Sequence, residues 1–293
     1  MFMPMFKTAI FLVIIWCCYF YPSDGCLEEK RTHLLQIKDS INYPHGSSLD
    51  EDWVGKNCWE WPRIECNSSS SRMISIDLFS IRGEVGVWYP NASLFAAFKE
   101  LEELVLSEDH IDGWVAPQAF SEMQSLRKLY LLSNNLFASI DSLQGLCEFR
   151  NLQCLGLSGS NLDGRVLPPC LSNLSKLEEL SLSDNDLGSY SSALTGLCGL
   201  SALKYLDLSG NYFNDSNLPM GMGNFYLLES LNLSRNNLSG HFGNSTSGLK
   251  RLQELDLSLN QFTDDGISPW ISNLTSLTTL WLQKNALREA PTP

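Results

Sequence analysis

Residues 177–185 read Leu-Glu-Glu-Leu-Ser-Leu-Ser-Asp-Asn, and the same spacing of three leucines and one asparagine returns along most of the chain. The asparagines of this pattern lie 24 to 26 residues apart or at twice that spacing: Asn134, Asn185, Asn211, Asn236, Asn260 and Asn285. Two further copies carry Asp109 and Ser160 in the asparagine position, which makes eight repeats. A degenerate copy at residues 73–81 precedes them, and we expect it to start the sheet.

Repetition at this period predicts a solenoid in which each repeat supplies one strand and one return segment. Side chains alternate between the two faces of a strand, so the leucines point inward and the positions between them form an open sheet. The asparagine amide both donates to and accepts from the backbone where the chain leaves the strand, and Asp109 and Ser160 provide part of this bonding. The expected fold is an α/β leucine-rich repeat solenoid, a horseshoe or superhelix with a parallel β-sheet on its concave face.

The first 25 residues have the pattern of a secretory signal peptide. Lys7 precedes an apolar run over residues 9–20, and Ser23 and Gly25 occupy the positions before a cleavage site at Cys26. The run is too short to span a bilayer, and no other stretch reaches 18 apolar residues. We therefore expect a secreted, extracellular protein with no membrane segment in this chain apart from the signal peptide.

Glycosylation sequons and net charge agree with an extracellular protein. Eight Asn-x-Ser/Thr sequons occur, at Asn67, Asn91, Asn173, Asn214, Asn232, Asn237, Asn244 and Asn273. A glycan on Asn232 would block part of the concave face, whereas the unmodified side chain would form a ladder with its neighbours. The formal charge of −13 argues against nucleic acid and against anionic membranes. It favours solubility or a basic partner.

The cysteines leave alternatives open. Of nine cysteines, two precede the cleavage site, and the remaining seven require at least one free or intermolecular thiol. In the N-terminal region, Cys58 pairs either with Cys66 or with Cys26, and the longer loop to Cys26 stabilises more. Cys147 and Cys170 lie in adjacent repeats and can pair, but we expect buried free thiols there. Cys154 occupies a concave position as an exposed thiol.

The N-terminal region resembles a known family of caps. Residues 26–41 read CLEEKRTHLLQIKDSI with one apolar helical face, and residues 58–66 read CWEWPRIEC after Trp53. This resembles the plant-type N-terminal cap of extracellular leucine-rich repeat proteins. Trp59 stands where that family often has a second cysteine, and the family's pairing implies a disulfide between Cys26 and Cys58. The expected domains are a signal peptide (1–25), the cap (26–72) and the repeats (73–293) without a C-terminal cap.

No motif points to catalysis. The four histidines are scattered, and no zinc-protease, nucleotide-loop or serine-hydrolase pattern occurs. Asp264 and Asp265 follow Phe262 in what we expect to be a return loop with solvated carboxylates. We predict no enzyme activity, metal or cofactor.

Recognition should therefore use the concave positions between the leucines. The candidate ligand-binding residues are Glu103, Lys128, Tyr130, Glu179, Tyr205, Asp207, Arg235, Trp281 and Lys284. The aromatic members offer rigid contact area, which is typical of binding hot spots.

Segments 88–107 and 167–187 resemble plant receptor-like proteins, which carry such repeats, one transmembrane helix and no kinase domain. The resemblance implies a truncated ectodomain that binds an extracellular peptide or protein and signals through a co-receptor kinase in defence or development. The protein would lie at the plasma membrane if the full-length gene adds a transmembrane helix. An alternative is a soluble inhibitor similar to polygalacturonase-inhibiting proteins, which bind a cell-wall hydrolase but carry a C-terminal cysteine cap. A fragment without a binding role is a third reading.

Overall fold

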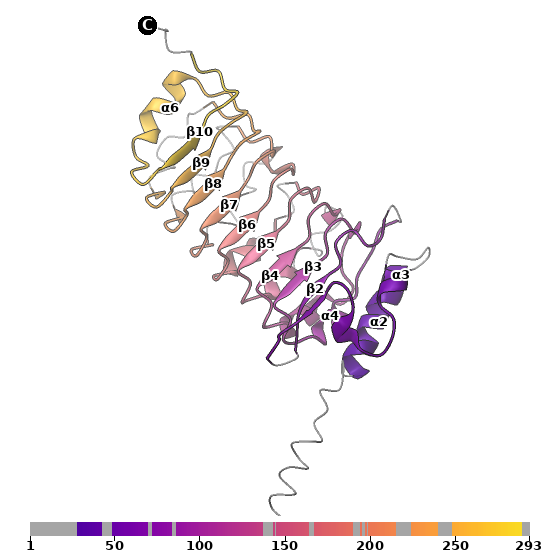
Figure 1. Ribbon diagram of the computed structural model, residues 1–293. Helices are drawn as coiled ribbons and strands as arrows, with labels where there is room; N and C mark the ends of the chain where they lie inside the picture. The colour runs from indigo at the N-terminus through magenta and orange to yellow at the C-terminus, as the bar shows by residue number, and fades with distance from the viewer. Residues whose placement is uncertain are drawn as a thin grey trace, which may run out of the picture.

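The structure is a computed structural model, and it describes residues 28–42, 49–69, 72–83, 86–136, 143, 145–163, 167–189, 194, 197, 199–214, 224–239 and 248–288. The predicted signal peptide, Cys26 and the sequon at Asn244 lie outside the described residues. Figure 1 shows an elongated solenoid whose strands stack in sequence order along its length. This arrangement confirms the predicted leucine-rich repeat fold.

Within the described residues, ten short strands form one sheet. They are β1 (Ile64–Cys66), β2 (Met73–Asp77), β3 (Glu103–Val105), β4 (Lys128–Tyr130), β5 (Cys154–Gly156), β6 (Glu179–Ser181), β7 (Tyr205–Asp207), β8 (Ser230–Asn232), β9 (Glu254–Asp256) and β10 (Thr279–Trp281). From β2 to β10 all neighbouring strands are parallel and in one register, so Leu129 pairs with Leu155 and Leu155 with Leu180. β1 pairs antiparallel with β2, so the prediction that residues 73–81 start the sheet was wrong by one strand.

The leucine pattern separates the two faces of the sheet. In β4, Leu129 is buried, whereas Lys128 is exposed and Tyr130 half-buried. The same alternation recurs in β6, β7 and β9. Leucines therefore fill the interior as predicted, and the residues between them form what we call the strand face, the outward side of β2 to β10.

The recurrence of asparagine at one position of the repeats is explained by bonds that join two repeats. Asn185 Oδ1 accepts from the backbone N–H groups of Ser160 and Leu162 at 3.1 and 2.9 Å. Its Nδ2 donates to the carbonyls of Leu157 and Leu182, both at 2.9 Å. The predicted backbone bonding is confirmed, and it also ties each turn to the preceding repeat. The same network recurs around Asn134, Asn211, Asn236 and Asn260.

Asp109 and Ser160 each replace part of this network. Ser160 Oγ donates to the Leu131 carbonyl at 2.8 Å. Asp109 Oδ1 accepts from the N–H groups of Ile81 and Arg82 at 3.0 and 3.3 Å, while its Oδ2 is buried without a hydrogen bond. Burial raises the pKa of Asp109 to about 7, and the bonds from Ile81 and Arg82 and the nearby Arg82 charge oppose that rise without cancelling it. The aspartate accepts but, when ionised, cannot donate as asparagine does.

Helices occupy the cap and the return segments. They are α2 (Glu28–Asn42), α3 (Leu49–Asp52), α4 (Ala92–Ala96) and α6 (Asp264–Ile271), and the 3₁₀ helices η1 (Cys58–Glu60), η2 (Pro117–Glu122), η4 (Gly145–Glu148), η5 (Pro169–Asn173) and η6 (Leu187–Ser189). In Figure 1, α2 and α3 lie at the N-terminal end of the sheet and α6 near its other end. The expected return loop at Asp264 and Asp265 was wrong, because these exposed residues form the first turn of α6. Carboxylates there interact favourably with the helix dipole.

The cap packs on the first repeats through α2. Leu34, Ile37 and Ile41 are buried, as the predicted apolar face requires. Lys30 Nζ donates to the Ala97 carbonyl and lies 5.2 Å from the centre of the Phe98 ring. The helix is therefore fixed to the segment that follows α4.

Tryptophans and a disulfide hold the remainder of the cap. Trp53 and Trp61 stack with ring centres 5.6 Å apart, and each indole N–H donates to a backbone carbonyl. Cys58 is disulfide-bonded, whereas Cys66 is a free thiol whose pKa burial raises to about 11. The alternative that pairs Cys58 with Cys66 was therefore wrong. Because Cys26 lies outside the described residues, its pairing with Cys58 stays a prediction.

A second disulfide crosses two return segments. Cys147 in η4 and Cys170 in η5 are bonded, with their Cα atoms 5.7 Å apart. The expectation of free thiols at these positions was wrong, because stacking of adjacent repeats brings η4 and η5 within disulfide distance.

Candidate functional site

Seven of the nine residues that the sequence predicts for ligand binding lie on the strand face, and Arg235 and Lys284 lie in the turns that follow β8 and β10. The residue directly before the central leucine of a strand is a candidate in four strands: Glu103, Lys128, Glu179 and Tyr205. The residue directly after that leucine is a candidate in three: Tyr130, Asp207 and Trp281. The position directly before the repeat asparagine holds the other two, Arg235 and Lys284. Four of them, Tyr130, Glu179, Tyr205 and Asp207, surround one hollow in the middle of the sheet. Trp281 and Lys284 belong to the last repeat and do not reach it. The structure thus brings together fewer than half of the predicted residues.

The hollow has a volume of about 400 Å³ and lies over β5 and β6. The hollow forms because β5 and β6 carry the small residues Gly156 and Ser181 at one register position. At the same position the flanking strands β4 and β7 carry the larger side chains Tyr130 and Asp207. A Cβ added at Gly156 would lie 3.0 Å from the Tyr130 ring and 2.8 Å from the side chain of Leu132. The glycine therefore lets Tyr130 lean across β5. The sequence pattern did not reveal this hollow, although Gly156 was its signal.

Cys154 forms part of the floor of this hollow. Its Sγ lies 3.5 Å from Tyr130 Oη and 3.4 Å from Glu179 Oε2. Burial raises the pKa of the Cys154 thiol, and burial together with the contact to Cys154 raises the pKa of Tyr130. Both groups are therefore neutral donors at ordinary pH. The predicted exposed thiol is instead half-buried among larger side chains.

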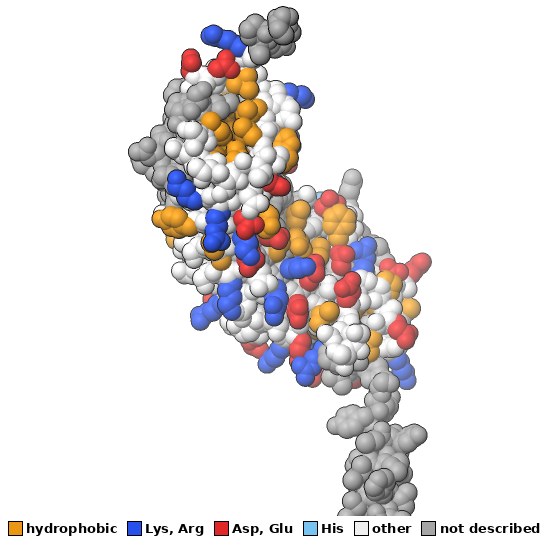
Figure 2. Space-filling view, turned by 60° about the vertical axis from the view of Figure 1, so that its left-hand side comes forward, with side chains coloured by type: hydrophobic (Ala, Val, Ile, Leu, Met, Phe, Trp, Pro, Cys, Tyr) orange, Lys and Arg blue, Asp and Glu red, His pale blue; other side chains and the backbone are white. Residues whose placement is uncertain are grey.

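Basic side chains near the hollow are already paired with carboxylates. Lys128 Nζ lies 3.6 Å from Glu103, and Lys204 Nζ lies 2.7 Å from Glu178, in each case on the preceding repeat. These pairs are exposed and stabilise the fold little, but they neutralise each other locally. Figure 2 shows acidic and basic side chains interspersed along the molecule, as such pairing produces.

Inside the hollow the charge is negative. Glu179 and Asp207 line it, and no basic side chain is among the described residues that do so. Asp207 Oδ1 accepts from the Ser209 N–H at 2.9 Å, and within the described residues neither carboxylate forms an ion pair. The hollow therefore combines two carboxylates with two tyrosines.

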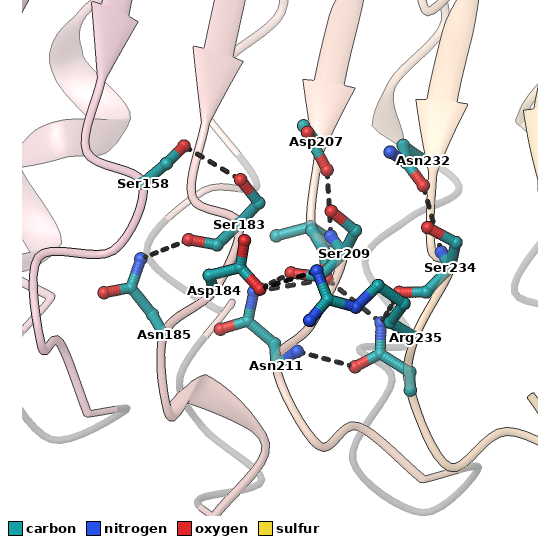
Figure 3. Close-up of polar contacts among 12 residues, drawn as sticks. Ser158, Ser183, Asp184, Asn185, Asp207, Ser209, Asn211, Asn232, Ser234 and Arg235 are labelled. Atoms are coloured by element: carbon teal, nitrogen blue, oxygen red, sulfur yellow. Dashed lines mark hydrogen bonds and ion pairs between the residues drawn. The ribbon is translucent and has the colours of Figure 1, made fainter. Parts of the chain in front are cut away.

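Arg235 lies outside the hollow, at the edge where the chain leaves the strands. Its guanidinium reaches back across one whole repeat to Asp184, with Nη1 3.2 Å from Oδ1 (Figure 3). The intervening Gly210 has φ +63°, and a Cβ there would lie 2.4 Å from Asp184 Oδ1. Glycine leaves room for this ion pair. Arg235 is therefore directed to its own chain in this structure.

A shallower second hollow adjoins that edge. It has a volume of about 490 Å³ and is lined by Tyr212, Arg235, Asn236, Asn237 and Leu259. Tyr212 is 72% exposed there, and Asn237 belongs to a sequon. A glycan on Asn237 would cover this hollow.

The sequons differ in their exposure. Asn67, Asn173, Asn237 and Asn273 are exposed, whereas Asn91, Asn214 and Asn232 are half-buried. Asn232 lines the central hollow, and its Oδ1 accepts from the N–H of Ser234 two residues on (Figure 3). The expected ladder with neighbouring strands was wrong, because the side chain bonds its own turn. A glycan on Asn232 would cover the hollow.

Across the described ranges, no group of three histidine, cysteine or carboxylate side chains is placed to hold a metal ion. In the same part of the chain, no helix has the length and hydropathy needed to cross a bilayer.

Family models identify the repeats. Two models, both described as leucine-rich repeat, match residues 173–189 and 250–269 and residues 202–225 and 227–249.

Similar proteins come from plants. The chain is 31% identical over 243 residues to Cuscuta receptor 1 of Solanum lycopersicum. The matched region covers 78% of this chain and 20% of that protein. It is also 35% identical over 163 residues to Receptor-like protein 9a of Arabidopsis thaliana. That matched region covers 55% of this chain and 17% of that protein. The chain spans about a fifth of the length of these relatives.

Solved structures show the same fold. The ectodomain of the Arabidopsis receptor kinase HAESA, in complex with an IDA peptide hormone ligand, has a TM-score of 0.63 and 26% identity, covering 89% of this chain and 42% of that chain. A plant ice-binding protein has a TM-score of 0.57 and 25% identity, covering 92% of this chain and 90% of that chain. With the repeats, the strand face and these relatives together, the chain belongs to the leucine-rich repeat proteins, in the group of plant receptor-like proteins.

Proposed function

We propose that this chain is an extracellular recognition module that binds a peptide or protein ligand on its strand face. The hollow between Tyr130 and Tyr205 is the observation that carries the proposal, because it offers aromatic contact area and, among the described residues, two carboxylates without an ion-pair partner on a rigid sheet. The HAESA ectodomain, which has the same fold, holds a peptide hormone ligand. The receptor-like relatives support the same class of activity.

The signalling role is the second part of the proposal. We infer that the ligand-bound module acts through a partner kinase, in defence or in development, and that it works in the apoplast or at the plasma membrane. The support is the similarity to receptor-like proteins and to a receptor-kinase ectodomain.

Filling the hollow tests the binding proposal. Ser181→Trp places an indole on the floor between Tyr130 and Asp207, and Asp256→Trp places one at the matching position of β9, two strands beyond β7. Peptides retained from plant extracellular fluid by the full-length secreted protein would be identified by mass spectrometry. We expect Ser181→Trp to lose specific peptides that Asp256→Trp keeps. Equal retention by both variants, with unchanged melting curves, would contradict the proposed site.

A further inference from the structure

We propose that the central hollow receives a basic side chain, arginine or lysine, of the ligand. The inference rests on the proposed function and names the chemistry of the contact. The hollow's two charged residues, Glu179 and Asp207, are both acidic, and both lie on strands rather than on loops. Its two largest side chains are Tyr130 and Tyr205. Carboxylates form charge-assisted hydrogen bonds with a cation, and aromatic faces attract it as well.

The carboxylates have free bonding capacity. Asp207 uses Oδ1 for the Ser209 N–H, which leaves Oδ2 for a ligand. Glu179 uses Oε2 for the Cys154 thiol, which leaves Oε1. Each oxygen that is already bonded accepts from a neutral group, so neither negative charge is neutralised by the protein. An entering ammonium or guanidinium group would supply the missing positive charge.

The nearest basic side chains of the protein do not fill this role. Lys128 and Lys204 are each paired with a glutamate of the preceding repeat, at 3.6 and 2.7 Å. The hydrogen bond from Lys204 to Glu178 raises the pKa of Lys204, which holds the lysine charged in that pair. Among the described residues, neither Lys128 nor Lys204 is therefore the ion-pair partner of Glu179 or Asp207.

The dimensions suit a long side chain. Tyr130 on β4 and Asp207 on β7 are separated by three strand spacings, about 14 Å along the sheet. Gly156 and Ser181 between them leave the volume of about 400 Å³ open. A Lys or Arg stem can lie on the tyrosine rings while its charged end reaches the carboxylates. The chain's net charge of −13 also attracts basic peptides from a distance.

Two double variants separate the hollow from general charge. Glu179→Gln with Asp207→Ser removes both carboxylates of the hollow. Glu254→Gln with Asp256→Ser removes two carboxylates from the matching positions of β9, where Asp256 accepts from Ser258 as Asp207 does from Ser209. Serine is used because asparagine at either aspartate would create a sequon with the serine two residues on.

The test uses a random 12-residue peptide library displayed on phage and selected on the full-length secreted protein. We expect the enriched peptides to share an arginine or lysine, and its replacement by glutamine in a synthetic peptide to weaken binding to the unmodified protein by about tenfold or more. The double variant that removes Glu179 and Asp207 should bind the peptide more weakly by a similar factor. The double variant in β9 should lose less than about threefold in affinity.

Each other outcome overturns the inference in an identifiable way. Enriched peptides without a shared basic residue, or equal losses in the two double variants, would contradict the cation site while leaving peptide binding intact. Failure to enrich any peptide would contradict the proposed function as well. The arginine-to-glutamine comparison uses unmodified protein, so it tests the need for a basic side chain even if a variant folds poorly, and the two double variants then locate its contact.

Discussion

Replacing Asp109 by asparagine should stabilise the protein, and by an amount that depends on pH. Asp109 is completely buried in the asparagine position, and its Oδ2 has no hydrogen bond. In the next repeat, Asn134 Nδ2 donates to the carbonyls of Leu106 and Leu131 at 2.8 and 3.0 Å. Asp109→Asn would supply the matching donor, and it creates no sequon because the second residue after it is Ile111.

The size of the effect follows from the pKa. The Asp109 pKa is about 7 in the folded protein, against 3.8 for an ordinary aspartate, so the folded state holds this proton more tightly than the unfolded chain does. Stability therefore falls as pH rises from about 4 to about 7, and the loss is complete above that range. The difference corresponds to about 4 kcal/mol at pH 8. Asparagine does not ionise and escapes this loss.

Urea unfolding at pH 4.5, 6 and 8, followed by tryptophan fluorescence, measures the difference. We expect the free energy of unfolding of Asp109→Asn to exceed that of the unmodified protein by about 4 kcal/mol at pH 8. At pH 4.5 the two free energies should lie within about 1 kcal/mol of each other, because a protonated aspartate can itself donate a hydrogen bond. Glu108→Gln, an exposed neighbour with the same charge change, serves as the control and should show no such trend. An advantage for Asp109→Asn that is absent at pH 8, or that is equal at all three pH values, would refute the reasoning.

Four further expectations follow from single contacts. Asn185→Ala should lower the free energy of unfolding by about 4 kcal/mol, because it leaves buried backbone groups in two repeats without partners, and a urea midpoint near that of the unmodified protein would contradict this. Removing the disulfide with Cys147→Ser and Cys170→Ser should lower the free energy of unfolding by about 3 kcal/mol, because the bond closes a loop between residues 23 positions apart. Cys66→Ser removes a free thiol and should lower it much less in the same denaturation assay. Gly188→Ala should lower the free energy of unfolding by about 2 kcal/mol or more, because the added Cβ would lie 2.4 Å from the Tyr212 backbone. An unchanged melting temperature would contradict this and show that the backbone relaxes freely. Peptide mapping should find glycans on the exposed Asn173 and Asn273 but not on Asn232, and full occupancy at Asn232 would argue against ligand binding in the hollow.

Repetition made the scaffold predictable from the sequence. A leucine such as Leu180 meets another leucine in the same register on both neighbouring strands, so one repeat determines the environment of the next. The asparagine bonds follow for the same reason, because an amide is the side chain that both donates and accepts at a turn. Both features depend on local periodicity, which the sequence displays directly.

Features that arise between repeats were harder to predict. The hollow exists because Gly156 follows Tyr130 in the stacking direction, and the sequence places these two residues 26 positions apart. The bond between Cys147 and Cys170 and the ion pair from Arg235 to Asp184 likewise depend on how return segments and turns stack. β1 was missed because its antiparallel pairing lies in the cap, outside the repeat pattern.

Ligand recognition by the strand face is the central claim, and site-specific photo-crosslinking tests it most directly. Tyr205 on β7 borders the hollow and is 45% exposed, whereas Tyr226 is 62% exposed in the turn that precedes β8. A benzophenone amino acid would replace each tyrosine in turn in the secreted protein, which is then irradiated in plant extracellular fluid. We predict a discrete peptide or protein adduct at position 205 and none at position 226. The same adducts at both positions, or an adduct at position 226 alone, would contradict the claim.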